Sequence, residues 1–183
     1  MKRSIIIPQE IERQVRAYLF RNKLEQGVFL FAHPVETEAA LRLEVQDAYL
    51  VPPEGWRVQL AVYLEMKDEE RAKIMKMARD GGYAVIDCHS HPGSGEEVEF
   101  SLSDRAGITD FAPYVQWKLG GKPFAALVWG ENSLDGVMWH GDFKQAQRID
   151  EVVIDRKERT VIIPRATWFE QRLDTWYGRS YVV

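Results

Sequence analysis

The 183-residue sequence contains a single cysteine, Cys88, so it cannot form an intramolecular disulfide. It also lacks an apolar run close to the roughly 20 residues that a membrane-spanning helix needs. The apolar stretch at residues 5–7 is short and is followed by Pro8, which is unlike the core of a signal peptide. These absences predict a soluble protein of a reducing, cytoplasmic compartment.

An excess of basic residues is also absent. The formal net charge is −4, and no basic cluster stands out, which disfavours a nucleic-acid-binding protein. Neither internal repeats nor low-complexity tracts occur, and the content of 45% hydrophobic and 28% charged residues is ordinary for a globular protein. We therefore expect one domain over residues 1–143 and an extension over residues 144–183 that packs on the same domain.

The hydrophobic periodicity predicts an α+β fold, a mixed β-sheet flanked by helices. We expect helices over residues 8–24, residues 68–79 with a stop at Gly81 and Gly82, and from Asp104 until Pro113 breaks the helix. Strands are expected at residues 27–32, 41–45, 58–66, 83–88, 124–129, 136–139 and 160–163, with a loop at residues 33–38. The aromatic-rich end of the chain is expected to form core or a lid, and its aromatic residues are Trp168, Phe169, Trp176, Tyr177 and Tyr181.

The chemically informative segment is His89-Ser90-His91-Pro92, which follows an apolar strand. Residues i and i+2 of an extended chain point to the same side, so both imidazoles can reach one ion. Asp104 lies near the start of a predicted helix and can supply a third ligand. Two nitrogens and one carboxylate oxygen suit a catalytic zinc, which keeps its fourth position for water.

Each part of this pattern also has a simpler explanation. Ser101 and Asp104 have the spacing of a helix capping box. Cys88 alternates to the opposite side of the strand from the histidines, which indicates a buried packing residue. Asp87 shares the side of the histidines and could orient one of them.

Taken together, His-x-His-Pro followed by Ser-x-x-Asp resembles the JAMM motif of the MPN-plus (JAB domain) zinc metalloproteases, in their compact prokaryotic form. The resemblance covers the chain from Pro8 to about His140 and implies the JAB/MPN, cytidine-deaminase-like architecture. It implies that His89, His91 and Asp104 bind Zn²⁺. Nine residues separate His91 from Ser101 where the family usually has seven, and we expect the exposed loop at residues 93–100 to accommodate the difference.

The family also uses a glutamate that precedes a strand, and the match here is Glu25, within the segment Glu25-Gln-Gly-Val-Phe-Leu-Phe-Ala. Val28 and Ala32 stand where the family favours glycine. The other candidates for this role are Glu36, Glu38, Glu44 and Glu65. The resemblance implies that Glu25 is the general acid/base and that Ser101 helps to stabilise the oxyanion.

The activity implied is hydrolysis after the C-terminal glycine of a ubiquitin-like protein, either in deconjugation or in precursor maturation. The partners would then be that protein and the activating and conjugating enzymes of its pathway. Two alternatives remain open: a peptidase that releases an amino acid such as cysteine from a sulfur-carrier protein, and a non-catalytic MPN scaffold.

Overall fold

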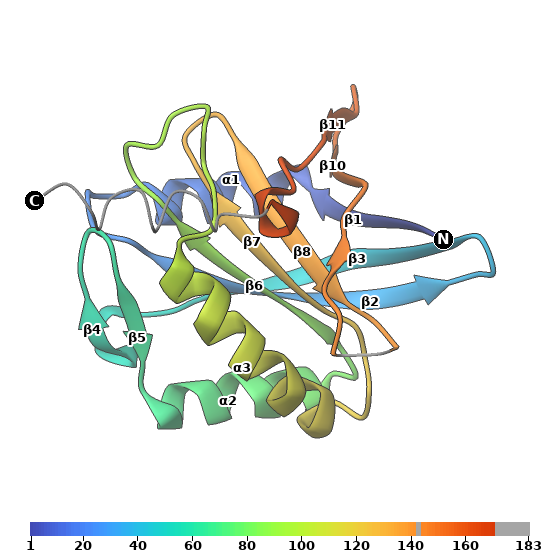
Figure 1. Ribbon diagram of the computed structural model, residues 1–183, viewed down its shortest axis with the longest axis horizontal. Coiled ribbons are helices and arrows are strands. Elements are labelled where there is room, and N and C mark those ends of the chain that lie inside the picture. Colours follow the sequence, from blue (N-terminus) through green and yellow to red (C-terminus); the bar gives the residue numbers. More distant parts are fainter. Residues whose placement is uncertain (142–143, 171–183) are drawn as a thin grey trace, which may run out of the picture.

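The computed structural model describes residues 1–141 and 144–170 (Figure 1). These residues form a mixed α/β fold with a nine-stranded sheet, a separate two-stranded hairpin, three α-helices and two short 3-10 helices. The strands of the large sheet are β1 (Lys2–Pro8), β2 (Gly27–Glu36), β3 (Ala40–Leu50), β6 (Ala84–Ser90), β7 (Phe124–Trp129), β8 (Leu134–Trp139), β9 (Gln147–Arg148), β10 (Glu151–Asp155) and β11 (Thr160–Ile162). The remaining elements are β4 (Trp56–Gln59), β5 (Leu64–Met66), α1 (Gln9–Leu19), α2 (Asp68–Asp80), α3 (Leu102–Lys118), η1 (Pro53–Gly55) and η2 (Thr167–Phe169).

The strand order of the large sheet is β11-β10-β1-β3-β2-β6-β7-β8-β9. β1 runs parallel to β3 and β10, and β6 runs parallel to β7, whereas the other neighbouring strands are antiparallel. The sheet is therefore mixed, as the sequence predicted.

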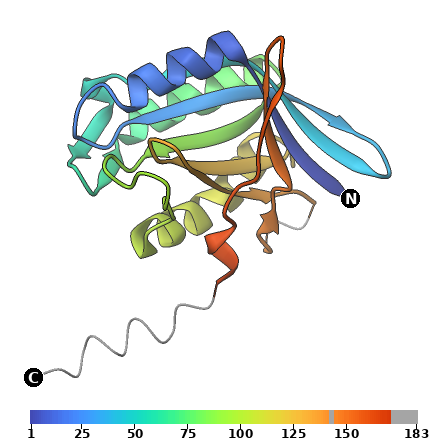
Figure 2. The same cartoon turned by 90° about the horizontal axis from the view of Figure 1, so that it is seen from above.

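Hydrophobic cores cover both faces of the sheet. The first core packs under α1, and the second core packs under α2 and α3 on the opposite face. Figure 2 shows α1 and α3 on opposite sides of the sheet. Successive residues of β2 alternate between them, with Val28 and Leu30 in the first core and Phe29 and Phe31 in the second. This two-sided burial explains why β7 and residues 27–32 of β2 are continuously apolar in sequence.

Several predicted elements are confirmed with small shifts at their ends. α2 covers residues 68–80, and its stop is confirmed because Gly81 is the C-cap and Gly82 has a positive φ of 68°. β6, β7, β8 and β11 lie where strands were predicted. Local signals were sufficient here because each segment has a clear hydrophobic periodicity and is followed by residues that end a helix or strand.

The prediction for the N-terminal part was wrong in two respects. Residues 2–8 form β1, so α1 begins at Gln9 and ends at Leu19. Residues 33–36 continue β2 and do not form a loop. β1 gains its partners from β3 and β10, which are distant in sequence, so the local pattern carried little information about it.

Two further predictions need correction. Residues 58–66 do not form one strand, because β4 and β5 pair as an antiparallel hairpin. Pro113 lies inside α3 and does not end it. Pro113 is exposed, while Ile108 and Val115 are buried on the other side of the helix. Burial of these two side chains stabilises the helix by about 1.5–3 kcal/mol each, which offsets a proline cost of about 3 kcal/mol.

The extension beyond residue 143 contributes β9, β10 and β11 to the large sheet, of which only β11 was predicted. Of its aromatic residues, Trp168 and Phe169 lie in η2, whereas Trp176, Tyr177 and Tyr181 fall outside the described residues. No helix in the described ranges has the length and apolar character that crossing a membrane requires.

Candidate metal centre

Both histidines of the motif lie at the C-terminal end of β6. His89 is inside the strand, and His91 follows it directly, where its backbone N–H donates to the Trp129 carbonyl at 2.9 Å. Cys88 is fully buried in the first core, on the opposite face, as the alternation predicted. The two imidazoles can therefore approach each other, and their ring centroids are 5.0 Å apart.

Asp104 reaches the histidines from the first turn of α3. Ser101 is the N-cap, and its Oγ accepts a hydrogen bond of 3.1 Å from the Asp104 N–H. In return, Asp104 Oδ2 accepts a hydrogen bond of 2.7 Å from the Ser101 N–H. The predicted capping box is therefore present, and it directs the Asp104 carboxylate back towards β6.

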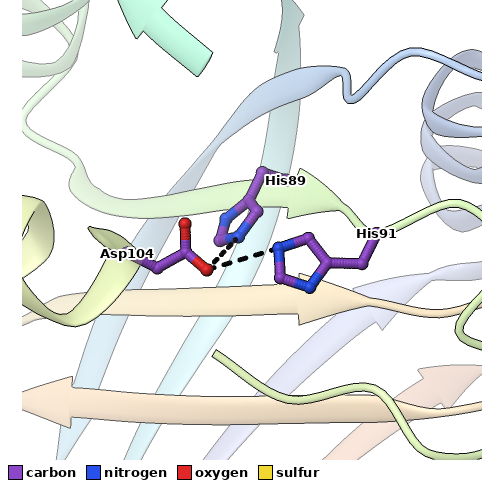
Figure 3. Close-up of side chains that lie close together, drawn as sticks. All are labelled: His89, His91 and Asp104. Carbon is purple, nitrogen blue, oxygen red and sulfur yellow. Dashed lines mark ion pairs between the residues drawn. The ribbon is translucent and has the colours of Figure 1, made fainter. Parts of the chain in front are cut away.

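The three side chains converge on one point (Figure 3). Asp104 Oδ2 lies 3.5 Å from His89 Nε2 and 3.3 Å from His91 Nε2. One ligand atom from each residue lies within 4.8 Å of the other two, so the group can hold a metal ion. His89 Nε2 is buried and has no hydrogen-bond partner among the described residues. A buried nitrogen without a partner is expected where the atom binds a metal ion or another ligand. The residues present thus fit a cation with two nitrogen ligands and one oxygen ligand.

The electrostatics of the site also favour a positive charge. Burial alone would lower the pKa of His89, but the carboxylates of Asp104, Asp87 and Glu25 outweigh it and raise that pKa. Burial would raise the pKa of Asp104, but the attraction of His89, the close approach of both histidine rings and the hydrogen bond from the Ser101 N–H hold it well below its ordinary value. Asp104 is therefore an anion at neutral pH, ready to bind a cation.

Glu25 lies beside the same histidines although it comes from the segment before β2. Its Oε1 is 3.4 Å from His91 Nε2, and the residue is only 4% exposed. The β4–β5 hairpin holds its backbone, since Glu25 N–H donates to the carbonyl of Leu60 in the loop and Gln59 Nε2 at the end of β4 donates to the Glu25 carbonyl, both at 2.9 Å. Burial raises the pKa of Glu25, and Asp104 adds to this, while the histidines oppose it.

The competing glutamates lie elsewhere. Glu36 pairs with His140, Glu44 with Arg42 and Glu65 with Arg57, and Glu38 is exposed. Within the described residues, only Glu25 of these candidates is recorded in contact with a histidine of the motif. The geometry therefore agrees with the sequence match.

A pocket of about 160 Å³ opens beside the three converging side chains. Glu25, His89 and Asp104 lie in its wall together with apolar side chains from the hairpin and α3. Arg71 of α2 also lines it, with its guanidinium 5.1 Å from the centroid of the Phe111 ring. No local pattern in the sequence indicated Arg71, because the approach of α2 to this pocket depends on the packing of the second core.

Asp87 and Ser101 have less direct positions. Asp87 lines the pocket, as the strand alternation predicted, and burial raises its pKa to about 6. No hydrogen bond joins Asp87 to His89 in the described part of the chain, so the orienting contact that the sequence left open is not seen. Ser101 Oγ caps the N-terminus of α3 by accepting the hydrogen bond from Asp104 N–H, and it lies 2.9 Å from Ser103 Oγ.

The loop at residues 93–100 was expected to be exposed, but part of it is buried. Val98 and Phe100 are fully buried in the second core. Near its start, the Glu131 carboxylate accepts hydrogen bonds from the N–H groups of Gly93 at 2.5 Å and Gly95 at 2.8 Å. The loop is therefore anchored at both ends, which fixes the path of the chain from His91 to Asp104.

Comparison with known proteins bears on the fold alone. No protein-family model and no curated protein matches the chain. The chain is similar in structure to protein DSY2949 from Desulfitobacterium hafniense, a structural-genomics target solved in solution. The two share 14% sequence identity over 84% of this chain and 94% of the other, with a TM-score of 0.54. The chain thus shares its overall fold with a solved structure, and its own residues must carry the functional argument.

Proposed function

We propose that this protein is a zinc-dependent isopeptidase or peptidase of the JAMM type, acting after the C-terminal glycine of a ubiquitin-like protein. The observation that carries the proposal is the convergence of His89, His91 and Asp104, with the buried Glu25 carboxylate 3.4 Å from His91. These four residues come from three separate segments, and the motif of the JAMM family assigns a role to each of them.

The structural context of the motif supports the same assignment. The histidines end a central strand, and the aspartate lies in the first turn of the following helix, with the glutamate on the neighbouring strand's N-terminal side. A mixed sheet with α1 on one face and α2 and α3 on the other is compatible with a JAB/MPN architecture.

In the proposed mechanism, His89, His91 and Asp104 would hold the zinc ion. When bound, zinc would supply a water whose pKa is lowered to about 7 and a Lewis acid for the substrate carbonyl. Glu25 accepts a proton from the attacking water at its Oε1 and later donates it to the leaving amine. Its burial favours this role, because a carboxylate in a poorly solvated place holds a proton more tightly than an exposed one.

The approach to the site suits an extended chain. β4 and β5 pair with each other and with no other described strand, so each keeps an open edge beside the pocket. An extended C-terminal tail can pair with such an edge through backbone hydrogen bonds. Ser101 would stabilise the oxyanion: its Oγ accepts a bond from Asp104 N–H, and its own proton is available for donation when Ser103 is the donor in the 2.9 Å contact between the two hydroxyls.

The test is cleavage of a panel of ubiquitin-like proteins fused through their C-terminal glycine to a reporter, together with sulfur-carrier proteins that end in cysteine. We expect cleavage of one class to require zinc and to be lost in His89→Ala and Asp104→Asn, while His33→Ala, which changes an exposed histidine of β2, cleaves normally. Cleavage that persists after complete metal removal contradicts the mechanism. Purified protein that holds stoichiometric zinc and cleaves no member of the panel favours the scaffold alternative.

A further inference from the structure

The C-terminal segment around η2 makes close contacts with the helix that carries Asp104. Arg105, the residue after Asp104, donates from Nη1 to the Trp168 carbonyl at 2.7 Å and from Nη2 to the Thr167 carbonyl at 2.5 Å. The Arg105 guanidinium also lies 5.7 Å from the centroid of the Trp168 ring. Hydrogen bonds from a charged group are stronger than neutral ones, so Arg105 ties the start of α3 to a segment more than 60 residues away.

The same segment is anchored to the sheet. Asp135 of β8 is fully buried, and its carboxylate accepts hydrogen bonds from the Thr167 N–H, at 3.1 Å to Oδ2, and from the Thr167 hydroxyl. The N–H of Gly136 supplies another donor at 2.8 Å. A buried carboxylate is costly unless donors surround it, so Asp135 needs Thr167 in place. Thr167 itself is 1% exposed.

Aromatic packing then connects η2 to a histidine of the site. The Trp168 ring contacts the rings of Trp139 and Phe100 edge to face, with centroid distances of 5.4 Å and 5.2 Å. Phe100 is fully buried, and its ring centroid is 6.0 Å from that of His89. Phe100 also directly precedes Ser101, the cap of α3.

We propose that Trp168 and Arg105 are positioning residues of the metal centre, so that the C-terminal segment is a structural part of the site. Trp168 holds Phe100 against His89, and Arg105 holds the first turn of α3, which carries Asp104. These contacts act on His89 and Asp104, two candidate ligands whose side chains must lie within a few ångströms of each other to bind one ion. This inference rests on the proposed metal centre, and it adds that Trp168 and Arg105 influence the affinity and geometry of that centre.

The test is Co²⁺ binding to the full chain after metal removal, followed by the visible absorption of the bound ion. We expect Trp168→Ala to weaken Co²⁺ binding about tenfold, the lower end of the effect of residues that orient metal ligands. We also expect its absorption spectrum at saturation to change, which a general loss of stability does not produce. Trp168→Phe, which restores an aromatic ring against Phe100, should recover affinity to within about threefold. Phe169→Ala is the matched control, because Phe169 lies in the same turn but is 45% exposed.

Arg105→Gln provides a second measurement that removes no aromatic ring, and its result tests the proposal if Trp168→Ala does not fold. Native affinity and a native spectrum in the folded variants overturn the positioning role while leaving the metal centre in place. Failure of the unsubstituted chain to bind Co²⁺ or Zn²⁺ overturns the proposed metal centre and this inference with it.

Discussion

Replacement of Glu25 by glutamine is the most direct test of the chemistry at this site. The change removes the proton-accepting carboxylate and keeps its size and most of its hydrogen-bonding capacity. Glu25 is held by its backbone contacts to Leu60 and Gln59, which the substitution does not alter. We therefore expect a folded protein in which zinc is still bound by His89, His91 and Asp104.

The size of the effect follows from the role of the group. General acid/base catalysis contributes about 10²–10⁴-fold to a rate. This range corresponds to about 2.7–5.5 kcal/mol in the activation barrier. The variant loses the charge attraction between Glu25 and His91, but a buried amide is less costly to desolvate than a buried carboxylate, so we expect stability to change by less than about 1 kcal/mol. The loss of turnover therefore cannot be attributed to unfolding.

The assay measures kcat for the identified fusion substrate, zinc content and the free energy of unfolding in urea for the same preparations. Glu36→Gln is the matched control, because Glu36 is half exposed and pairs with His140, away from the site. We expect normal turnover in the control and a loss of at least about 100-fold in Glu25→Gln. Full turnover of zinc-loaded Glu25→Gln would refute the assignment of Glu25 as the acid/base.

Three further predictions concern the structure around the site. Gly27→Ala places a Cβ 2.5 Å from the Trp56 ring, so we expect a destabilisation of about 1–3 kcal/mol in urea unfolding and a distorted pocket with raised KM. Ser101→Ala removes the N-cap of α3, and we expect a loss of about 1 kcal/mol, also measured in urea, together with slower turnover. Bonds from loop N–H groups lower the pKa of Glu131, so the stability it confers is present above pH 4.5 and is lost as the pH falls through its folded pKa. The protection factors for amide exchange in the loop after His91, which compare the observed rate with the intrinsic rate at the same pH, should therefore fall in acid, and Glu131→Gln should reduce this pH dependence; an unchanged profile in that variant contradicts the anchoring role.

The sequence was informative wherever a single segment carried its own signal. The i, i+2 spacing of His89 and His91 on an apolar strand indicates that they share a side, and Ser101 and Asp104 have the spacing of a helix cap. α2 was predicted together with its stop because its periodicity and its terminal glycines lie within about 15 residues. These features depend on the backbone geometry of a short stretch, which neighbouring residues determine.

Other features depended on contacts that no local pattern encodes. β1 is a strand because β3 and β10 lie beside it, and Pro113 is tolerated because its side of α3 is exposed. The proximity of Glu25 to His91 was expected only from the family motif, and the structure brings the two together through the pairing of β2 with β6.

The surroundings of the candidate centre were decided by tertiary structure alone. Arg71 reaches the pocket through the packing of α2 in the second core, and Trp168 reaches Phe100 through the bonds that Asp135 and Arg105 make to η2. By itself, the sequence determined the identity and local spacing of the ligand atoms. The fold determined what encloses them, because side-chain packing between distant segments depends on the whole arrangement of strands and helices and not on the period of any one of them.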